Sequence, residues 1–411
     1  MATLVVSPNI YLGHGRKAVA TEGFICFEAP EIHYFGYCDD FGPMNAAAIL
    51  DFIDIVDRNI QSNPGVNLIF CAGNGKRNFT NAAFLLGSYA ILSRNETPEE
   101  LWKRLGALPA ETFEFYRDAT FTESKFDLTL LDCWRGLARA KTLGWIDSPQ
   151  NDGNVPFGSL DKDEYKHYDN PLNGDLHFVV PGKFIAFRGP VDLPGGEEYL
   201  DQDGFREFSA HYYVELFQVL GVSTVVRLNE RRYDGGVFEA AGIRHVDLPF
   251  EDCTAPPDAV VARFLRAADA ASGLVAVHCK GGLGRTGTLI ALYMMRRHGF
   301  TARAAMGWLR VMRPGSVIGE QQHYLCAVER DVAAAAAAAA ARQPRRAASF
   351  TAALLQEPSV PVAAGRSAGR RMVPRASQGV AVGCKANEPV LKGRPSQQES
   401  KFRTRTGARV V

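Results

Sequence analysis

Two stretches of the chain repeat the same order of apolar and polar positions. Residues 274–277 form an apolar, β-prone run, a glycine-rich loop follows, and residues 288–295 have the apolar character of a buried helix. The order of strand, loop and helix start recurs over residues 67–77, with an apolar helical segment at 82–92. This repeat predicts two α/β domains of similar construction.

Between the two stretches, the pattern predicts a linker and a short helix. Residues 150–156 are rich in turn-forming residues. Residues 159–168 are expected to form a short helix capped by Ser159. Three acids stand in its first turns, where they suit the helix dipole: Asp161, Asp163 and Glu164. The predicted boundaries are those of a first domain, a linker, a second domain and a tail: residues 1–149, 150–175, 176–332 and 333–411.

The composition changes abruptly after residue 332. Residues 333–341 are all alanine, and arginine and lysine then accumulate while aromatic and branched apolar residues become rare. Such a composition predicts a disordered tail over residues 333–411. Its basic clusters leave three interpretations open: a nuclear import signal, a patch for an anionic surface, or a solvated tail.

Length and composition narrow the class of protein. The 411 residues have room for two ordinary domains and a tail. A net charge of +1 and a hydrophobic content of 46% are typical of a soluble globular protein and give no reason to expect a nucleic-acid partner. We expect no signal peptide, and no apolar run approaches the ~20 residues that span a bilayer. The eight cysteines have no paired spacing, so we expect no zinc site and no other cofactor.

The glycine-rich loop of the second stretch carries the most specific chemistry. Cys279 and Arg285 stand six positions apart, and the residues between them are Lys280, Gly281, Gly282, Leu283 and Gly284. Glycines let successive backbone N–H groups turn inward, and a helix start adds positive potential, so the loop predicts a phosphate cradle. The same field favours the thiolate of Cys279, a nucleophile for phosphorus. The planar guanidinium of Arg285 can hold two phosphoryl oxygens at once.

Two neighbours of the loop each have a structural and a functional interpretation. His278 is expected to orient the loop rather than to act as a catalyst, because a buried histidine usually serves in hydrogen bonding. Thr286 is either an ordinary first-turn residue or a donor to the Cys279 sulfur that eases its departure as a thiolate. The sequence leaves the choice for Thr286 open.

Cleavage of a phosphate ester by a thiolate also needs an acid near the leaving oxygen. Residues 245–248 are predicted to form a strand, and the prolines and small polar residues after it a mobile loop. Asp247 alternates with apolar neighbours inside the strand and is interpreted as structural, and Asp258 as the cap of the next helix. Glu251 and Asp252 remain on the loop, and position favours Asp252.

The chain resembles the cell division cycle fourteen family of dual-specificity phosphatases, the mitotic-exit phosphatases. The resemblance runs from about residue 4 to residue 332, with the motifs in the family's order. Six segments carry it: residues 40–45, 81–85, 181–187, 225–229, 278–288 and 310–319. It implies an α/β fold of two tandem dual-specificity-phosphatase-like domains, each a central mixed sheet flanked by helices, with the first domain degenerate and a disordered tail at the end.

The resemblance also implies a role for each site residue. By it, Cys279 is the nucleophile, Arg285 the phosphate ligand and Asp252 the general acid, while Gln321 and Gln322 place the hydrolytic water. The implied activity is hydrolysis of phosphoserine, phosphothreonine and phosphotyrosine through a phosphocysteine intermediate, without a metal. Two alternatives remain: a phosphoinositide phosphatase, and an inactive scaffold that binds phosphoproteins.

The implied substrates are proteins in which phosphoserine precedes proline, as left by cyclin-dependent kinases, with a basic residue downstream. In the family, linker acids form a groove for that basic residue. Here the corresponding acids are Asp161, Asp163, Glu164 and Asp169, although Lys166 interrupts them and each also suits a solvated helix end. The resemblance further implies a cell-cycle or ciliary role and a location in the nucleus and cytoplasm, including spindle, centrosome or cilium. The oligomeric state is not indicated.

Three positions depart from the family pattern. Gly282 stands where alanine is usual in the cradle, a mild change that is expected to add flexibility. Cys253 stands where glycine is usual, directly beside Asp252, so the mobility or the redox behaviour of the acid loop is expected to differ. Glu320 stands where proline is common, just before the glutamine pair, and this puts their placement of water in doubt.

The first domain carries a loop with the same spacing. Cys71 and Arg77 are also six residues apart. We do not expect a second active site, because no histidine precedes Cys71, one glycine is missing, Lys76 stands beside the arginine, and Asn78 replaces the hydroxyl residue. Binding of phosphate by this loop, or a part in shaping the substrate groove, stays open.

Overall fold

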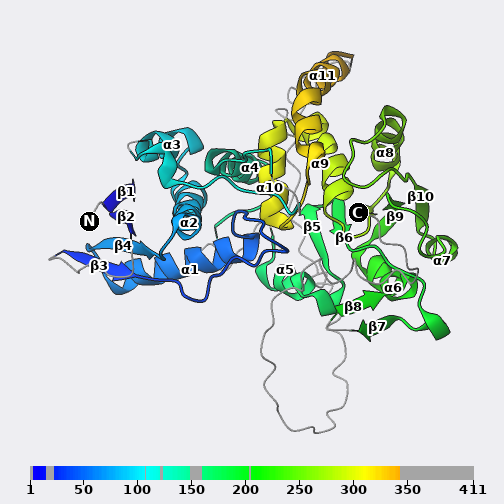
Figure 1. The fold of residues 1–411 in the computed structure, drawn as a ribbon, viewed down its shortest axis with the longest axis horizontal. Helices are drawn as coiled ribbons and strands as arrows, with labels where there is room; N and C mark the ends of the chain where they lie inside the picture. Colours follow the sequence, from blue (N-terminus) through cyan, green and yellow to red (C-terminus); the bar gives the residue numbers. More distant parts are fainter. Residues whose placement is uncertain are drawn as a thin grey trace, which may run out of the picture.

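The computed structural model describes residues 3–14, 23–106, 108–120, 124–148, 160–202 and 205–342. In Figure 1 the chain forms two neighbouring domains, the first in blue to cyan and the second in green to yellow. Each domain has its own sheet with helices packed beside it. The predicted α/β fold of two tandem domains is therefore confirmed.

The first domain is built on a four-stranded sheet in the order β1-β2-β4-β3. Its elements are β1 (Thr3–Ser7), β2 (Ile10–His14), β3 (Phe24–Phe27), α1 (Ala46–Ser62), β4 (Asn67–Ala72), α2 (Lys76–Arg94), α3 (Pro98–Leu105) and α4 (Leu130–Thr142). β4 is parallel to both of its neighbours and β1 is antiparallel to β2, so the sheet is mixed. Residues 79–92 of α2 are all buried, which explains the apolar pattern of that segment.

The second domain is built on a five-stranded sheet in the order β10-β9-β11-β6-β5. Its elements are β5 (Leu176–Val180), β6 (Phe184–Phe187), β7 (Tyr199–Gln202), β8 (Phe205–Phe208), α6 (Ala210–Leu220), β9 (Val222–Arg227), α7 (Gly236–Ala240), β10 (Arg244–Asp247), α8 (Asp258–Ala270), β11 (Leu274–His278), α9 (Gly284–His298), α10 (Ala302–Met312) and α11 (Glu320–Arg342). β7 and β8 form a separate hairpin. The central strand β11 is parallel to β6 and β9, and it is apolar because both of its faces are covered.

The two domains meet where α4 packs against α10 (Figure 1). A glycine on each helix allows the backbones to approach closely. A Cβ atom on Gly136 would lie 2.4 Å from the Ala304 carbonyl oxygen, and one on Gly307 would lie 2.7 Å from the Cys133 Cα. Most of the buried apolar side chains form one core that runs through both domains, with Trp134 and Trp308 among the largest fully buried side chains. A second cluster of buried apolar side chains lies within the second domain.

The predicted linker helix is α5 (Lys162–Asp169), and its start differs from the prediction. Asp161 is the N-cap, with its carboxylate accepting from the backbone N–H groups of Asp163 and Glu164. Ser159, the predicted cap, lies outside the described residues. Asp161 can cap because its short carboxylate reaches the first free N–H groups.

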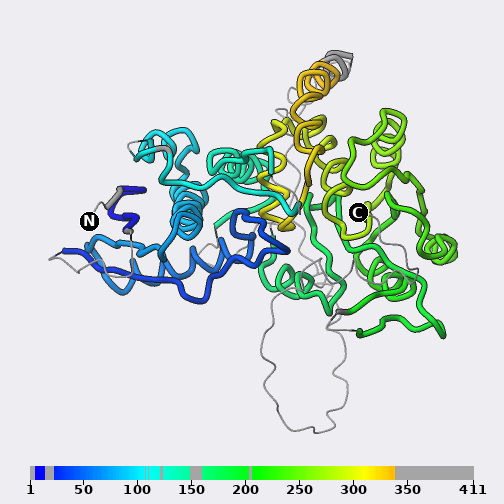
Figure 2. Tube along the Cα trace, viewed as in Figure 1, coloured from blue at the N-terminus to red at the C-terminus, as the bar shows by residue number. Residues whose placement is uncertain are grey.

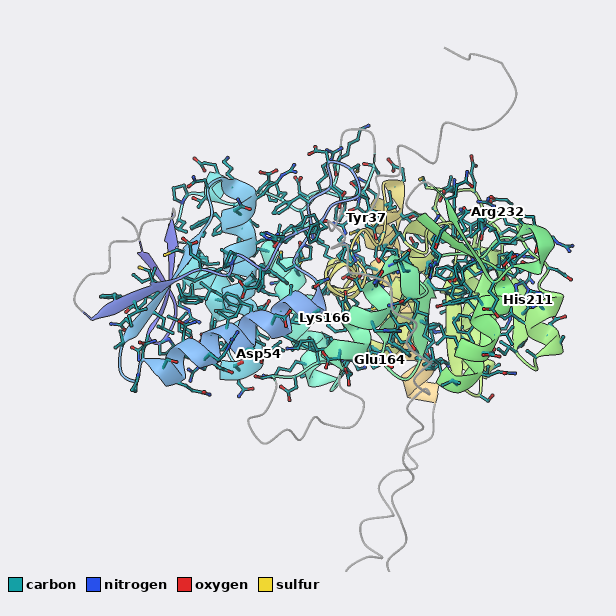
Figure 3. All side chains as sticks on the ribbon, turned by 90° about the horizontal axis from the view of Figure 1, so that it is seen from below. Tyr37, Asp54, Glu164, Lys166, His211 and Arg232 are labelled. Atoms are coloured by element: carbon teal, nitrogen blue, oxygen red, sulfur yellow. The ribbon has the colours of Figure 1, made fainter. Side chains whose placement is uncertain are left out.

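The lysines of α5 attach it to the first domain. Lys162 forms ion pairs with Asp51 and Asp54 of α1, at 3.1 and 2.6 Å, and Lys166 pairs with Asp51 at 2.8 Å. Figure 3 shows Lys166 and Asp54 where the two helices meet. The Tyr165 hydroxyl of α5 donates to the Met312 carbonyl in the second domain. The linker helix is therefore held by both domains.

The alanine run is helical, which corrects the predicted start of the tail. α11 continues from Glu320 through the alanines to Arg342. The orange part of the tube in Figure 2 belongs to this helix. Alanine has the highest helix propensity, so a helix anchored by its packed first turns extends through the run. Residues 343–411, with the basic clusters, lie outside the described residues. Among the described helices, none is both long and apolar enough to cross a membrane.

Candidate active site

The glycine-rich loop of residues 279–283 joins the end of β11 to the start of α9. β11 lies in the middle of the sheet, and the carboxyl ends of its parallel neighbours β6 and β9 reach the same edge. Ligands of open α/β sheets bind at such edges. Cys279 is the first loop residue and is only 3% exposed.

The carbonyl groups of this loop all point into the protein. The Cys279 carbonyl accepts from His278 Nδ1, and the Lys280 carbonyl accepts from the Gly189 amide. The Gly281 and Gly282 carbonyls accept from Nη2 and Nε of Arg313. The Leu283 carbonyl accepts from the amides of Gly287 and Val317. The C=O and N–H of a trans peptide point in opposite directions, so the amides that follow face away from these partners. Successive amides turned to one side at a helix start form an anion-binding cradle.

Gly282 is required by this turn, which corrects the expectation that glycine in place of alanine is a mild change at this position. Its φ is +70°, and an added Cβ would lie 2.1 Å from the Phe187 carbonyl oxygen. Any side chain at this position must displace the loop from β6, because backbone cannot yield as a flexible side chain does.

We predict that Gly282→Ala lowers kcat/KM for an aryl phosphate about 100-fold, since a displacement near 1 Å at a reacting centre has that effect. Gly182→Ala is the matched control, because Gly182 has nearly the same φ, +69°, but nothing within 4 Å of its added Cβ. Initial rates of both purified variants check the prediction. Equal rates for the two variants would contradict it.

His278 orients the first peptide of the loop. It is completely buried, and its Nδ1 donates to the Cys279 carbonyl at 2.9 Å, so Nε2 must accept from the Tyr233 hydroxyl, 2.8 Å away. Burial lowers the pKa of His278 to about 3. The imidazole is thus neutral near pH 7, and it acts on the loop through hydrogen bonds.

This burial makes the fold sensitive to acid. The unfolded histidine has a pKa of about 6.5, so a proton binds the unfolded chain more strongly than the folded chain. Stability is therefore complete above pH 6.5 and falls by about 1.4 kcal/mol per pH unit between 6.5 and 3. We predict that lowering the pH from 6.5 to 5 destabilises the protein by about 2 kcal/mol more than it destabilises His278→Asn. Urea denaturation at both pH values measures this, and parallel losses would contradict it.

Thr286 is buried beside the loop without the predicted contact to sulfur. Within the described part of the chain, its hydroxyl has no hydrogen-bond partner. The hypothesis that Thr286 donates to Cys279 in this state of the site is therefore not supported. The hydroxyl sits in the first turn of α9, one residue after Arg285.

Arg285 and Asp252 are brought together by the structure. Arg285 is 3% exposed, and its Nη1 donates to the carbonyl groups of Phe250 and Leu228 at 2.9 and 3.3 Å. Its Nε lies 3.1 Å from Asp252 Oδ1, an ion pair whose angle does not make a hydrogen bond. The Asp252 side chain is 58% exposed. This contact favours Asp252 over Glu251 as the candidate acid.

A cavity of about 500 Å³ joins the two loops. Its lining comes from the acid loop, from the segment after β9 and from the cradle: Glu230, Pro249, Phe250, Glu251, Asp252, Lys280 and Arg285. Lys280 and Arg285 therefore face the two candidate acids across one opening. Cys279 does not line this cavity, in keeping with its burial.

The acid loop lies between β10 and α8. Asp247, interpreted as structural, accepts two hydrogen bonds from Arg227 at 2.6 and 2.8 Å. Partial burial opposes ionisation of Asp247, but the hydrogen bonds and charge of Arg227 prevail and lower its pKa. Asp258 is the first residue of α8 and Pro257 is the N-cap, which corrects the capping role predicted for Asp258.

Cys253 occupies a backbone conformation that favours glycine. Its φ is +61°, in the left-handed region, and its N–H donates to Asp252 Oδ1 at 3.1 Å. This conformation explains why glycine suits the position, since a Cβ is disfavoured there by about 1–2 kcal/mol. The thiol side chain is exposed.

The two glutamines have different surroundings. Gln321 Nε2 donates to the Thr254 carbonyl of the acid loop at 3.2 Å, and its Oε1 would lie 2.8 Å from a Cβ on Gly284. Gln322 Oε1 instead accepts from Arg310 Nη2 at 2.7 Å. Only Gln321 lies between the acid loop and the cradle, so the predicted pair is reduced to one candidate for placing water.

Two of the four predicted groove acids already have partners. Asp161 caps α5, and Asp169 accepts from His177 Nε2 at 2.9 Å. Asp163 and Glu164 are exposed in the first turn of α5. Burial of part of its carboxyl, followed by the nearby charge of Asp161, raises the pKa of Glu164. The groove prediction now rests on Asp163 and Glu164.

The corresponding loop of the first domain is closed by acids. Cys71 lies within β4, and Arg77 in the first turn of α2 binds Glu114 at 2.8 Å and Asp39 at 3.1 Å. A phosphate would have to displace both carboxylates from Arg77. This geometry agrees with the prediction that the loop is not a second active site.

Sequence reasoning gave no role to several residues that hold the site. Arg313 binds two cradle carbonyls, although its segment was noted only for its resemblance. Tyr37 of the first domain packs on Gly315, where an added Cβ would lie 2.9 Å from its ring and 3.4 Å from Leu283. Figure 3 shows Tyr37 at the junction of the domains. No local pattern marks such contacts, because their partners are distant in the chain.

Comparison with known proteins agrees with this geometry. Residues 9–140 match the family described as "Dual specificity protein phosphatase, N-terminal half". Residues 209–353 match "Swiss Army Knife protein, DSP-PTPase phosphatase domain". The first match lies within the first domain, and the second begins after β5 and β6 and covers the rest of the second sheet.

Individual relatives extend the match over most of the chain. Dual specificity protein phosphatase CDC14C of Homo sapiens is 38% identical over 299 residues, which cover 72% of this chain and 63% of that protein. Tyrosine-protein phosphatase CDC14 of Candida albicans is 32% identical over 324 residues, 77% of this chain and 56% of that one. The chain thus spans less than two thirds of the length of these relatives. It belongs to the CDC14 family of dual-specificity phosphatases.

Proposed function

We propose that this protein hydrolyses phosphate monoesters on serine, threonine and tyrosine side chains of other proteins, through a phosphocysteine intermediate. The observation that carries the proposal is the cradle, in which the carbonyls of Cys279 to Leu283 all turn away and Arg285 lies beside Asp252. A phosphate dianion bound in the cradle accepts hydrogen bonds from the loop amides and from the Arg285 guanidinium at the same time.

In the first step, the Cys279 thiolate attacks phosphorus in line. The S–P bond forms, the P–O bond to the protein substrate breaks, and Asp252 gives its proton to the leaving oxygen. Arg285, which in this structure contacts Asp252 and the Phe250 carbonyl, turns its donors to the phosphoryl oxygens.

In the second step, Asp252 takes a proton from water positioned by Gln321. The water oxygen bonds to phosphorus, the S–P bond breaks, and inorganic phosphate leaves with Cys279 again a thiolate. No metal is needed, because Arg285 and the amides carry the phosphoryl charge.

The proposed substrates are phosphoserines followed by proline, with a basic residue downstream. Asp163 and Glu164, exposed on α5, support this preference, since a basic side chain is attracted to them. We further propose a cell-cycle or ciliary role in the nucleus and cytoplasm, which imaging of the fluorescently tagged chain would test.

Phosphate release from matched ligands tests the proposed function. One peptide carries phosphoserine, proline and a downstream lysine, a second has alanine for the proline, and a third has glutamate for the lysine. Phosphotyrosine peptide and phosphoinositide vesicles complete the set. We expect the first peptide to give the highest kcat/KM. Faster release from phosphoinositide would support the lipid alternative, and no release from any ligand would leave only the scaffold.

A further inference from the structure

The side of the cradle that faces away from the amides is held by one buried arginine. Arg313 follows α10 and is fully buried. Its Nε donates to the Gly282 carbonyl and its Nη2 to the Gly281 carbonyl, both at 2.9 Å. The direction of two consecutive peptides of the cradle therefore depends on where this guanidinium sits.

A buried histidine sets the position of that guanidinium. His177 on β5 is 1% exposed, and its Nδ1 lies 2.9 Å from Arg313 Nη1. Arginine can only donate, so Nδ1 accepts and the ring proton is on Nε2. Nε2 then donates to Asp169 Oδ1 at 2.9 Å. Asp175 completes the contact as a further acceptor for Arg313 Nη1.

Asp169 is the last residue of the linker helix α5. The same helix is bound to the first domain through Lys162 and Lys166. Tyr165 of the same helix packs its ring on His177, with the centroids 4.9 Å apart. The ring of His177 is thus located by the linker on one side and by Arg313 on the other.

We propose that His177 is a positioning residue through which the linker helix fixes the geometry of the phosphate cradle. The path runs from Asp169 to His177, then to Arg313 and the two glycine carbonyls. The proposal rests on the proposed function, because it concerns the same cradle. It also removes Asp169 from the groove and makes it part of the support of the cradle.

His177 itself is a risky position to change, because it is almost fully buried and its loss removes one of the acceptors of the buried Arg313 guanidinium. The Asp169 side chain is 27% exposed, at the end of a helix, so its variants should fold. Asp169→Ala removes the acceptor for His177, whereas Asp169→Asn keeps one with its amide oxygen. His167→Ala, an exposed position on the same helix, is the control.

We expect Asp169→Ala to lower kcat/KM for an aryl phosphate about tenfold and to weaken binding of orthovanadate by a similar factor, because the cradle moves. Asp169→Asn should restore both to near the wild-type value, and His167→Ala should change neither. An aryl phosphate has no downstream residue. If Asp169 acted only in the substrate groove, Asp169→Ala would therefore leave hydrolysis of the aryl phosphate unchanged.

Three results would overturn the proposal. Asp169→Ala could lower kcat/KM only for peptides with a downstream basic residue, or it could leave all rates and orthovanadate binding unchanged. The third is an Asp169→Asn variant whose kcat/KM and orthovanadate binding are as impaired as those of Asp169→Ala. Calorimetry with orthovanadate needs no turnover. If the wild-type chain binds orthovanadate without hydrolysing any ester, the proposed function fails while the positioning role is still measured. If it binds none, both fail.

Discussion

Cys279→Ser is expected to reduce hydrolysis of an aryl phosphate by at least about 10⁴-fold, to near the background rate. The serine hydroxyl stays protonated near neutral pH, so the attacking group is lost while the cradle amides and Arg285 remain. The thiol is almost fully buried and the replacement is close in size, so the fold should be kept. Absorbance of the released phenolate measures the rate, and thermal unfolding checks the fold.

The chain supplies its own control for this experiment. Cys71 is buried at the corresponding place in the first domain, six residues before Arg77. Cys71→Ser should have the same kcat per folded molecule as the wild-type chain. Turnover near the wild-type value in Cys279→Ser, or an equal loss in Cys71→Ser, would show that the nucleophile has been misassigned.

Asp252→Ala is expected to slow phosphoserine peptides by about 10²–10⁴-fold and aryl phosphates far less. A serine alkoxide is a poor leaving group that needs a proton as the P–O bond breaks, whereas an activated phenolate leaves almost unaided. The short distance between Asp252 and Arg285 places the carboxyl beside the phosphate ligand, as such an acid requires. Steady-state rates on the two substrates give the comparison.

Glu251→Ala tests the neighbouring acid in the same cavity. It should show a smaller difference between the two substrates than Asp252→Ala does. Equal slowing of both substrates by Asp252→Ala would argue that Asp252 holds Arg285 rather than protonates the leaving oxygen. A larger difference for Glu251→Ala would transfer the acid role to Glu251.

The cradle was predictable because its parts are contiguous. Cys279, the glycines and Arg285 belong to one strand, loop and helix start, and local rules of backbone conformation cover all of it. The acid loop was found by elimination, since its strand and the next helix left only two acids between them. The pairing of Asp252 with Arg285 needed the fold.

The errors have definite physical causes. Successive residues on a helix point about 100° apart, and in this structure Gln321 contacts the acid loop while Gln322 contacts Arg310. The alanine run is compositionally simple, yet it continues a helix that packing has already started. The linkage from Asp169 to Arg313 joins residues that are far apart in sequence, and a pattern of single positions does not contain it.

The reciprocal glycines of α4 and α10 bear on how this protein can be shortened. Gly136 and Gly307 let two backbones touch across the domain boundary, and Trp134 and Trp308 fill the core around them. In a fragment that contains only the second domain, the side of α10 that packs against α4 would be exposed to solvent. We therefore expect removal of the first domain to make the remaining domain prone to aggregation through its newly exposed apolar surface.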